Sequence, residues 1–344
     1  MSGSPHGRAG GADEGTAPAR VVIVFTGGTI SMTVDPTAGG ARPALDAAAL
    51  LASTGGAEAG DVVAIDLGRT PASHFSFADL LQIAGTARDA LAADPGAAGA
   101  VIVQGTDTMD EAAFAYDLAW PDARPLVVTG AMRTSDAPGA DGPANIRDAL
   151  AVAASPEFRD LGVVVVLNGE VHAADAVVKM HTTALDAFAS PDRGPIGRVD
   201  GGVPRLHRRP AGRRRVTGPV GEVPPVGLVI AAVGLDGSAI DAAVAGGARG
   251  IVVEATGSGN THPTLLAAAE RAMAAGVVIV LASRVPAGHV TTGYAFPGGG
   301  ATWARAGAIL AGRLTGPKAR VALSLGLAAG LDHAELAALL ADPG

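Results

Sequence analysis

The sequence contains no cysteine, and this absence removes several kinds of chemistry at once. Disulfide bonds, a thiol nucleophile and any metal site built from cysteine are excluded. Aromatic residues make up only 3% of the 344 residues, so the cores of a chain that is 48% hydrophobic must be built from Ala, Val, Leu and Ile. Hydroxyl groups are therefore the natural candidates if the protein needs a nucleophile.

Long apolar runs and an excess of positive charge are also missing. No stretch reaches the roughly 18 uninterrupted apolar residues of a membrane span. Residues 1–20 are rich in Gly, Ala and Pro and lack the apolar segment of a signal peptide, so we expect a disordered tail of a soluble, cytoplasmic protein. The net charge of −8 gives no reason to expect a nucleic-acid or membrane partner.

Short β-branched runs alternate with helical segments along most of the chain. This alternation predicts an α/β fold with a doubly wound, mainly parallel sheet in a larger N-terminal domain over 21–205. A smaller α/β domain is expected over 226–344. Expected strands are 21–25, 62–67, 101–104, 125–131, 162–170, 227–233, 250–256 and 276–283, and expected helices are 44–53, 77–94, 109–119, 141–155, 306–313, 318–331 and 334–340.

Between the two domains, residues 206–225 have the composition of a linker. The stretch from Arg205 to Pro225 holds six arginines and four prolines without periodicity. A basic run of this kind suggests either a nucleic-acid patch or a solvated connection. We favour the solvated linker because no aromatic residue is interleaved for base stacking.

Two of the expected strands end in glycine beside hydroxyl groups. The first stretch is VVIVFTGGTI over 21–30, and the second is VIVQGTDTMD over 101–110. Ligands of open α/β sheets bind at the carboxyl ends of the strands, and glycine lets backbone N–H groups approach a substrate closely. A hydroxyl beside bare amide donors suits acyl chemistry. For the first stretch alone, a tight turn with Thr as a helix cap is an equally good interpretation, and residues 31–43 after it are either a mobile lid or a passive loop.

A threonine nucleophile also needs a base, because its hydroxyl is almost fully protonated at neutral pH. Lysine can serve when burial or a neighbouring charge lowers its pKa, and this chain has only two, Lys179 and Lys318. Histidine offers little, since His172 and His181 are nine positions apart and no metal-binding spacing occurs, so no metal is expected.

TGGTI followed later by GTDTMDE resembles the signature stretches of the bacterial-type L-asparaginase and glutaminase family. The segment around Lys179 is also similar to the family, as are VVTGAMR, GIVVEATGSGN, ASRVPAG and LTGPKAR. The resemblance implies hydrolysis of L-asparagine to L-aspartate and ammonia through an acyl-threonine, with no cofactor. It makes Thr29 the nucleophile and Thr106, Asp107 and Lys179 a second catalytic set, with Asp107 also holding the substrate's α-amino group.

The same resemblance supplies the remaining expected binding residues. Gly28 and Gly105 would line the site, and Ser73 would hold the substrate carboxylate, in a register that the sequence leaves open between residues 72 and 74. Asn260 matches an asparagine that reaches a neighbouring subunit's site in the family's tetramers. This implies a homotetramer built as a dimer of dimers.

The chain departs from the family pattern at three places. Residues 31–60 hold no Tyr, Gln104 stands where many members have His, and the Glu that follows the SRV segment in some members is missing. Glutamine or a substituted asparagine as substrate, or a catalytically silent amino-acid-binding protein, therefore stay open. A Rossmann-type oxidoreductase is the weaker rival, because no GxGxxG follows the first strand.

Overall fold

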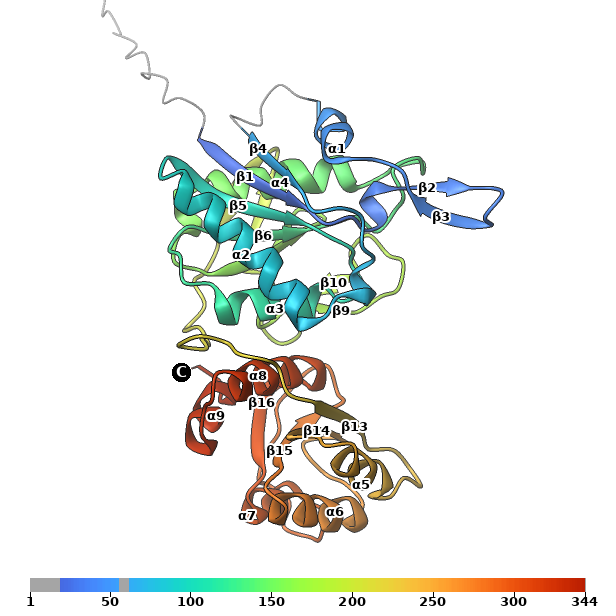
Figure 1. The fold of residues 1–344 in the computed structure, drawn as a ribbon, viewed down its shortest axis with the longest axis vertical. Helices are drawn as coiled ribbons and strands as arrows, with labels where there is room; N and C mark the ends of the chain where they lie inside the picture. Colours follow the sequence, from blue (N-terminus) through green and yellow to red (C-terminus); the bar gives the residue numbers. More distant parts are fainter. Residues whose placement is uncertain (1–18, 56–61, 344) are drawn as a thin grey trace, which may run out of the picture.

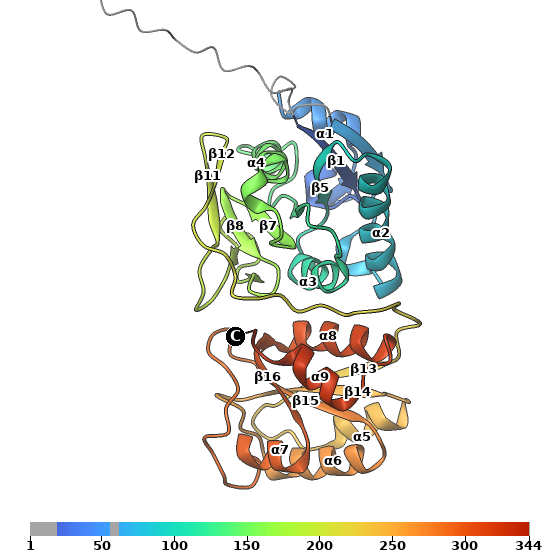
Figure 2. The same cartoon turned by 90° about the vertical axis from the view of Figure 1, so that its left-hand side faces the viewer.

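The computed structural model describes residues 19–55 and 62–343 and consists of two α/β domains. The larger N-terminal domain and the smaller C-terminal domain lie one above the other, and the segment that joins them runs between them (Figures 1 and 2). The expected disordered tail falls almost entirely on residues outside the described ranges, and Arg20 already opens the first strand. Within those ranges, every helix is too short or too polar to serve as a membrane span.

An eight-stranded sheet forms the centre of the N-terminal domain, with the strand order β12-β11-β8-β7-β6-β5-β1-β4. The five strands from β7 to β4 run parallel, and the other three are added antiparallel at one side. This confirms the prediction of a mainly parallel sheet. The strands are β1 (Arg20–Phe25), β4 (Val62–Asp66), β5 (Ala97–Val103), β6 (Leu126–Thr129), β7 (Val163–Leu167), β8 (Glu170–Ala173), β11 (Gly197–Asp200) and β12 (Val203–Leu206).

Helices cover both faces of this sheet because its central strands are apolar on both sides. On β1, Val22 and Val24 pack in the same core as helices α2 (Phe77–Ala93) and α3 (Met109–Ala119). The alternate residues of β1 pack with helices α1 (Ala47–Ser53) and α4 (Gly142–Ala154) in a second core. The doubly wound arrangement therefore follows from the alternation of side chains along a buried strand.

Two segments of the N-terminal domain form hairpins that the sequence did not indicate. Residues 31–43, expected to be a loop, contain β2 (Met32–Asp35) and β3 (Gly40–Pro43), which pair antiparallel and project from the domain (Figure 1). The strand expected over 162–170 turns back at Asn168, whose φ of 50° is left-handed, so that β7 pairs with β8. A further short pair, β9 (Val178–Lys179) with β10 (Phe188–Ala189), follows.

The C-terminal domain is built on a four-stranded parallel sheet with the order β13-β14-β15-β16. The strands are β13 (Val226–Ile230), β14 (Gly250–Ala255), β15 (Val278–Ser283) and β16 (Ile309–Thr315), and the helices are α5 (Ser238–Ala245), α6 (Pro263–Ala274), α7 (Gly300–Ala306), α8 (Gly316–Ala328) and α9 (His333–Leu340).

One prediction for the C-terminal domain was wrong. The helix expected over 306–313 is strand β16, preceded by helix α7. The Ala and Leu content of this segment favours a helix locally, but pairing with β15 at the edge of the sheet decides the conformation.

The connection between β12 and β13 forms no helix or strand over 207–225, yet it is not freely solvated. Arg214 is 5% exposed, and the Val216 amide donates to the carbonyl of Leu118 in the N-terminal domain. At its far end, the Gly221 amide donates to the Ala328 carbonyl of the C-terminal domain. The expectation of a solvated linker was therefore wrong for its middle part, because Arg214 finds carboxylate acceptors on both domains, Asp175 and Asp342.

Candidate active site

Three polar loops meet at the carboxyl edge of the large sheet. They follow the neighbouring parallel strands β4, β1 and β5, and they hold residues 72–74, 26–29 and 104–107 respectively. Thr108 Oγ1 donates to the Ala72 carbonyl at 2.9 Å and so joins the loop after β5 to the loop after β4. The two glycine-rich strand ends therefore lie together.

Gly28 and Gly105 are in direct contact, and Gly28 has to be glycine for this reason. A Cβ atom on Gly28 would lie 2.3 Å from the Gly105 nitrogen, and Gly28 has a φ of +97°. A Cβ atom on Gly105 would lie 3.0 Å from the Ala72 Cβ. The close backbone approach brings the residues that follow the two glycines, Thr29 and Thr106, to the same place on the sheet edge.

The two threonines of the loop after β1 differ in what their hydroxyls can do. Thr26 is 2% exposed, and its Oγ1 donates to the Val103 carbonyl of the adjacent strand at 3.1 Å. Thr29 is only partly buried and begins the short 3-10 helix Thr29–Ser31. The Thr26 hydroxyl is therefore occupied in holding the loop to β5, which leaves Thr29 as the threonine available for chemistry.

Lys179 brings the loop after β5 into contact with a distant part of the chain. Its Nζ donates to Thr106 Oγ1 at 2.9 Å and to Asp107 Oδ1 at 2.8 Å. The Lys179 side chain is 15% exposed, whereas the Asp107 side chain is 72% exposed. An open pocket of about 310 Å³ lies beside these groups, and its walls are Asp107, Lys179, Met180, His181 and Thr182.

The position of Lys179 is fixed by the backbone around it. Lys179 forms the end of β9 and pairs with Phe188 of β10, and the Met180 amide donates to the Ala187 carbonyl at 2.6 Å. The Lys179 amide itself lies 3.4 Å from Asp110 Oδ2, in the first turn of α3. Since Thr106 and Asp107 directly precede α3, the start of this helix and the amine of Lys179 are held together.

Gln104, where many family members have His, is fully buried behind the site. The Tyr116 hydroxyl on α3 donates to Gln104 Oε1 at 2.9 Å. Gln104 is 0% exposed and Tyr116 is 1% exposed. Burial raises the pKa of Tyr116, so this phenol stays protonated. The sequence singled out Gln104 without indicating that Tyr116 is its partner.

Lys318 is a functional candidate to which the sequence assigned no specific role. It lies on α8 of the C-terminal domain and is 1% exposed. Its Nζ reaches the N-terminal domain and donates to the carbonyls of Ala174 and Val177 at 2.6 and 2.5 Å. These carbonyls belong to the turn directly before Lys179. The signal in the sequence was the scarcity of lysine, which singled out both lysines.

Two further expected site residues, Ser73 and Asn260, lie outside this set of contacts. Ser73 is exposed in the 3-10 turn Ala72–His74, whose Ala72 abuts Gly105. Asn260 makes no hydrogen bond to this loop cluster within the described residues, and its backbone pairs with Thr256 in the C-terminal domain. In residues 19–55 and 62–343 there is no group of three or more His, Asp or Glu side chains that could hold a metal ion.

Two family models match the chain. "Asparaginase, N-terminal" matches residues 20–212, and "Glutaminase/Asparaginase C-terminal domain" matches residues 225–340. The chain belongs to the asparaginase family. It is an amidohydrolase of the L-asparaginase type, with the sheet order and loop cluster described above.

Individual relatives cover nearly the whole chain. An L-asparaginase of Bacillus licheniformis is 33% identical over 309 residues, which span 90% of this chain and 95% of that protein. A probable L-asparaginase of Deinococcus radiodurans is 35% identical, over 88% of this chain and 91% of that protein. The crystal structure of a probable cytoplasmic L-asparaginase from Campylobacter jejuni superposes with a TM-score of 0.82 at 29% identity, covering 94% of this asparaginase and 99% of that chain.

Other relatives have other names. One component of the glutamyl-tRNA(Gln) amidotransferase of Methanopyrus kandleri is 34% identical over 292 residues, which span 78% of this chain and 62% of that protein. A glutaminase-asparaginase of Pseudomonas fluorescens is 33% identical over 55% of this chain. The family therefore includes proteins named for glutamine as well as for asparagine.

Proposed function

We propose that this asparaginase hydrolyses the side-chain amide of L-asparagine to L-aspartate and ammonia through an acyl-threonine ester on Thr29. The observation that carries the proposal is the contact of Lys179 Nζ with both Thr106 Oγ1 and Asp107 Oδ1, at 2.9 and 2.8 Å. An amine that contacts a hydroxyl and a carboxylate together can move a proton at the edge of the site. Two relatives named as an L-asparaginase and a probable L-asparaginase, matched over 90% and 88% of this chain, support asparagine as the substrate.

In the first step, Thr29 Oγ1 attacks the amide carbon of the substrate. Its proton passes to the departing nitrogen, which leaves as ammonia, and an ester to Thr29 remains. Backbone N–H groups near Thr29 and Thr106 stabilise the oxyanion. No cofactor takes part.

In the second step, a water attacks the ester and releases L-aspartate. A proton of this water is relayed through Thr106 Oγ1 and Lys179 Nζ to the departing Thr29 oxygen, which becomes a hydroxyl again, and Asp107 holds the Lys179 amine in place. The exposed carboxylate of Asp107 also lines the open pocket, where it can bind the α-ammonium group of the substrate. Ser73, at the surface of the loop after β4, binds the substrate carboxylate.

A homotetramer built as a dimer of dimers completes this proposal. Asn260 Oδ1 is buried and accepts no hydrogen bond within the described part of the chain. The edge strand β13 and the loop after it expose apolar side chains, among them Ile230 at 51% and Val233 at 102%. Apolar surface on a sheet edge is suited to contact with a second copy, through which Asn260 reaches a neighbouring site.

The proposal is tested by ammonia release from L-asparagine and L-glutamine with the wild type and with Thr29→Val, Thr106→Val and Lys179→Met. All three variants are expected to lose at least about a thousandfold in kcat, as other enzymes do when a member of the catalytic set is removed. Thr26→Val is the matched control. The Thr26 hydroxyl donates to the Val103 carbonyl and takes no part in the proposed chemistry, so this variant is expected to keep its activity. An active Thr29→Val enzyme beside a dead Thr26→Val enzyme would overturn the assignment.

A different amide remains the specific alternative to asparagine. Glutamine differs by one methylene, which a pocket discriminates by only about 1–3 kcal/mol. If the wild type binds L-aspartate but releases ammonia from neither amide, the protein is a binding homologue and the proposed hydrolysis is wrong.

A further inference from the structure

The lysine of the proposed site lies on a hairpin that is too short to hold itself in place. Its strands β9 and β10 pair over Val178–Lys179 and Phe188–Ala189, two residues each. The tip over 180–183 is exposed, and β9 is only half-buried. An isolated two-stranded hairpin is at best marginally stable in water, so other contacts have to fix residues 178–189, which we name the Lys179 hairpin.

An ion pair joins the two ends of the Lys179 hairpin. Asp175 lies in the turn before β9, and Arg193 lies in the turn after β10. Backbone hydrogen bonds within 173–177 and within 190–194 present the two side chains, and Arg193 Nη1 lies 2.7 Å from Asp175 Oδ2. The pair therefore ties the half-buried strand that carries Lys179 to the strand that returns into the core.

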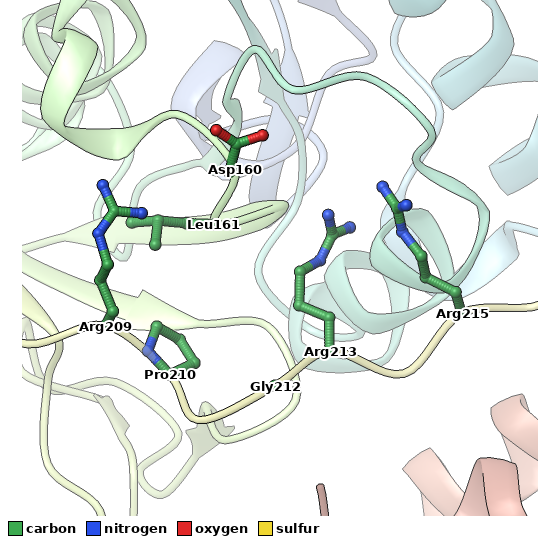
Figure 3. A pocket seen from close by; sticks show the side chains of 7 residues that line it. All are labelled: Asp160, Leu161, Arg209, Pro210, Gly212, Arg213 and Arg215. Carbon is green, nitrogen blue, oxygen red and sulfur yellow. The ribbon is translucent and has the colours of Figure 1, made fainter.

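A second arginine approaches the same carboxylate from the linker. Arg214 Nη1 donates to Asp175 Oδ2 at 3.0 Å, and its Nη2 donates to Asp342 Oδ1 at 3.1 Å. Figure 3 shows the neighbouring Arg213 and Arg215 rising together from one side of the linker. Arg214 lies between them in the chain and binds the two carboxylates instead, so the linker also secures the base of the Lys179 hairpin.

The Asp175 carboxylate is largely withdrawn from water by these contacts. The side chains of Asp175, Arg193 and Arg214 are 12%, 24% and 3% exposed. Opposite charges attract more strongly when they are partly desolvated, and removal of one partner leaves the other without compensation. Without the charge of Asp175, the two guanidinium groups repel each other, and the turn that leads into β9 loses its anchor.

The proposed site tolerates little movement of this turn. Lys179 Nζ contacts Thr106 Oγ1 at 2.9 Å and Asp107 Oδ1 at 2.8 Å. Asp175 precedes Lys179 closely in the chain, so a shift of the turn moves the amine away from these acceptors. Misplacing a catalytic group by about 1 Å costs on the order of a hundredfold in rate.

We propose that Asp175 and Arg193 are positioning residues for Lys179, holding the Lys179 hairpin so that the amine meets Thr106 and Asp107 together. The walls of the open pocket are formed by other residues, so this ion pair acts through Lys179 and not on the substrate. The effect on catalysis rests on the proposed amide hydrolysis, whereas the effect on the order of the hairpin does not.

Steady-state ammonia release by the full chain measures the catalytic effect. Asp175→Asn and Arg193→Gln are each expected to lower kcat at least about tenfold and to change KM less than about twofold, because the amine moves while the substrate contacts remain. Arg193→Lys keeps the positive charge and is expected to recover part of kcat. The Asp175→Asn, Arg193→Gln double variant is expected to lose no more than Asp175→Asn, because both residues act through one contact. Unchanged kcat in both single variants, or losses that multiply in the double variant, overturns the inference.

Asp122→Asn is the matched control for a merely structural effect. Asp122 pairs with Arg124 at 2.6 Å, and the two side chains are 21% and 15% exposed, so this pair resembles the Asp175 pair in length and burial. It lies shortly before β6, at the amino end of a strand whose carboxyl end faces the site. Urea unfolding is expected to show a loss of stability in Asp122→Asn as in Asp175→Asn, while kcat stays at the wild-type value. An equal fall in kcat in both variants overturns the inference.

Hydrogen exchange followed by mass spectrometry tests the order of the hairpin without reference to activity. The Met180 amide donates to the Ala187 carbonyl inside the Lys179 hairpin. Peptides that cover 176–190 are expected to exchange about tenfold faster in Asp175→Asn than in the wild type and to be unchanged in Asp122→Asn. Equal exchange in Asp175→Asn and the wild type overturns the inference. If the wild type releases ammonia from neither amide, the proposed function is wrong, and the exchange rates still decide whether the ion pair orders the hairpin.

Discussion

The Lys318 amine of the C-terminal domain donates a hydrogen bond to the Ala174 carbonyl of the N-terminal domain at 2.6 Å. The same amine donates to Val177, two residues before Lys179, and lies 5.8 Å from the centre of the Phe114 ring on α3. Lys318 thus contacts both segments that bring Lys179 to Thr106. The C-terminal domain thereby supports a site whose contacting groups all come from the N-terminal domain.

Lys318→Met is expected to lower the free energy of unfolding by about 1–3 kcal/mol at neutral pH, because two buried carbonyls lose their donor. It is also expected to reduce kcat for ammonia release more than it changes KM, since Lys179 loses its support. Lys318→Gln keeps a donor and is expected to recover part of the activity. Unchanged kcat in both variants would contradict a positioning role.

The stability effect of Lys318 has a defined pH dependence. Burial lowers the pKa of Lys318 from 10.5 to about 8. Below about pH 8 the amine is charged in the folded and unfolded states, and the full cost of burying that charge is present. Between about pH 8 and 10.5 the folded protein holds fewer protons, so the wild type gains stability relative to Lys318→Met as the pH rises. Urea unfolding of both proteins across this window measures the gain, and a constant difference would refute it.

Gly28→Ala is expected to damage the site through a steric overlap. The added methyl would lie 2.3 Å from the Gly105 nitrogen, so one of the two loops has to move. A displacement of about 1 Å costs roughly a hundredfold in rate. Gly39→Ala is the control: its φ of +70° is also left-handed, but no atom lies within 4 Å of the new methyl. Full activity of Gly28→Ala, or an equal loss of activity in Gly39→Ala, would contradict this steric explanation.

Asp107→Asn is expected to abolish most activity without a measurable loss of stability. The Asp107 side chain is 72% exposed, and ion pairs of this kind contribute only about 0–1 kcal/mol. Asp241→Asn, which breaks the exposed Arg271 pair at 2.8 Å in the C-terminal domain, is the matched control and should keep full activity. Thermal unfolding and ammonia release, measured side by side, separate the two effects. A large fall in the melting temperature of Asp107→Asn would indicate a structural role.

His172 makes the protein less stable in acid. Burial lowers the pKa of this histidine from 6.5 to about 4, so the ring is neutral at pH 7. The ring hydrogen-bonds to Ser190, and its Nε2 lies 3.3 Å from a Glu170 carboxylate oxygen. As the pH falls from about 6.5 to 4, the unfolded chain binds a proton that the folded protein does not, and stability is lost. His172→Gln is expected to remove on the order of 3 kcal/mol of this pH dependence, on the basis of the pKa difference. Parallel acid-unfolding curves for the two proteins would contradict it.

Local sequence determined most of the scaffold and the place of the site. Runs such as Val21–Phe25 are apolar at every position, which requires a strand that is buried on both faces. Parallel strands deliver their carboxyl ends to one edge, so the glycine and threonine residues after β1 and β5 had to meet there. The resemblance of the segment around Lys179 to a known family then named the lysine that lies beside them.

Tertiary structure decided the features that depend on distant partners. A helix was expected over 306–313, but residues 309–315 form β16, because the edge of β15 offers them hydrogen bonds. The linker arginines Arg213 and Arg215 are ordered by Asp117 and by the Trp120 carbonyl, 96 and 95 residues earlier in the chain, and no local pattern encodes such pairs. Lys318 likewise acts across 144 residues. Periodicity reports how a segment is buried, whereas the identity of the partner that buries it emerges only when the chain has folded.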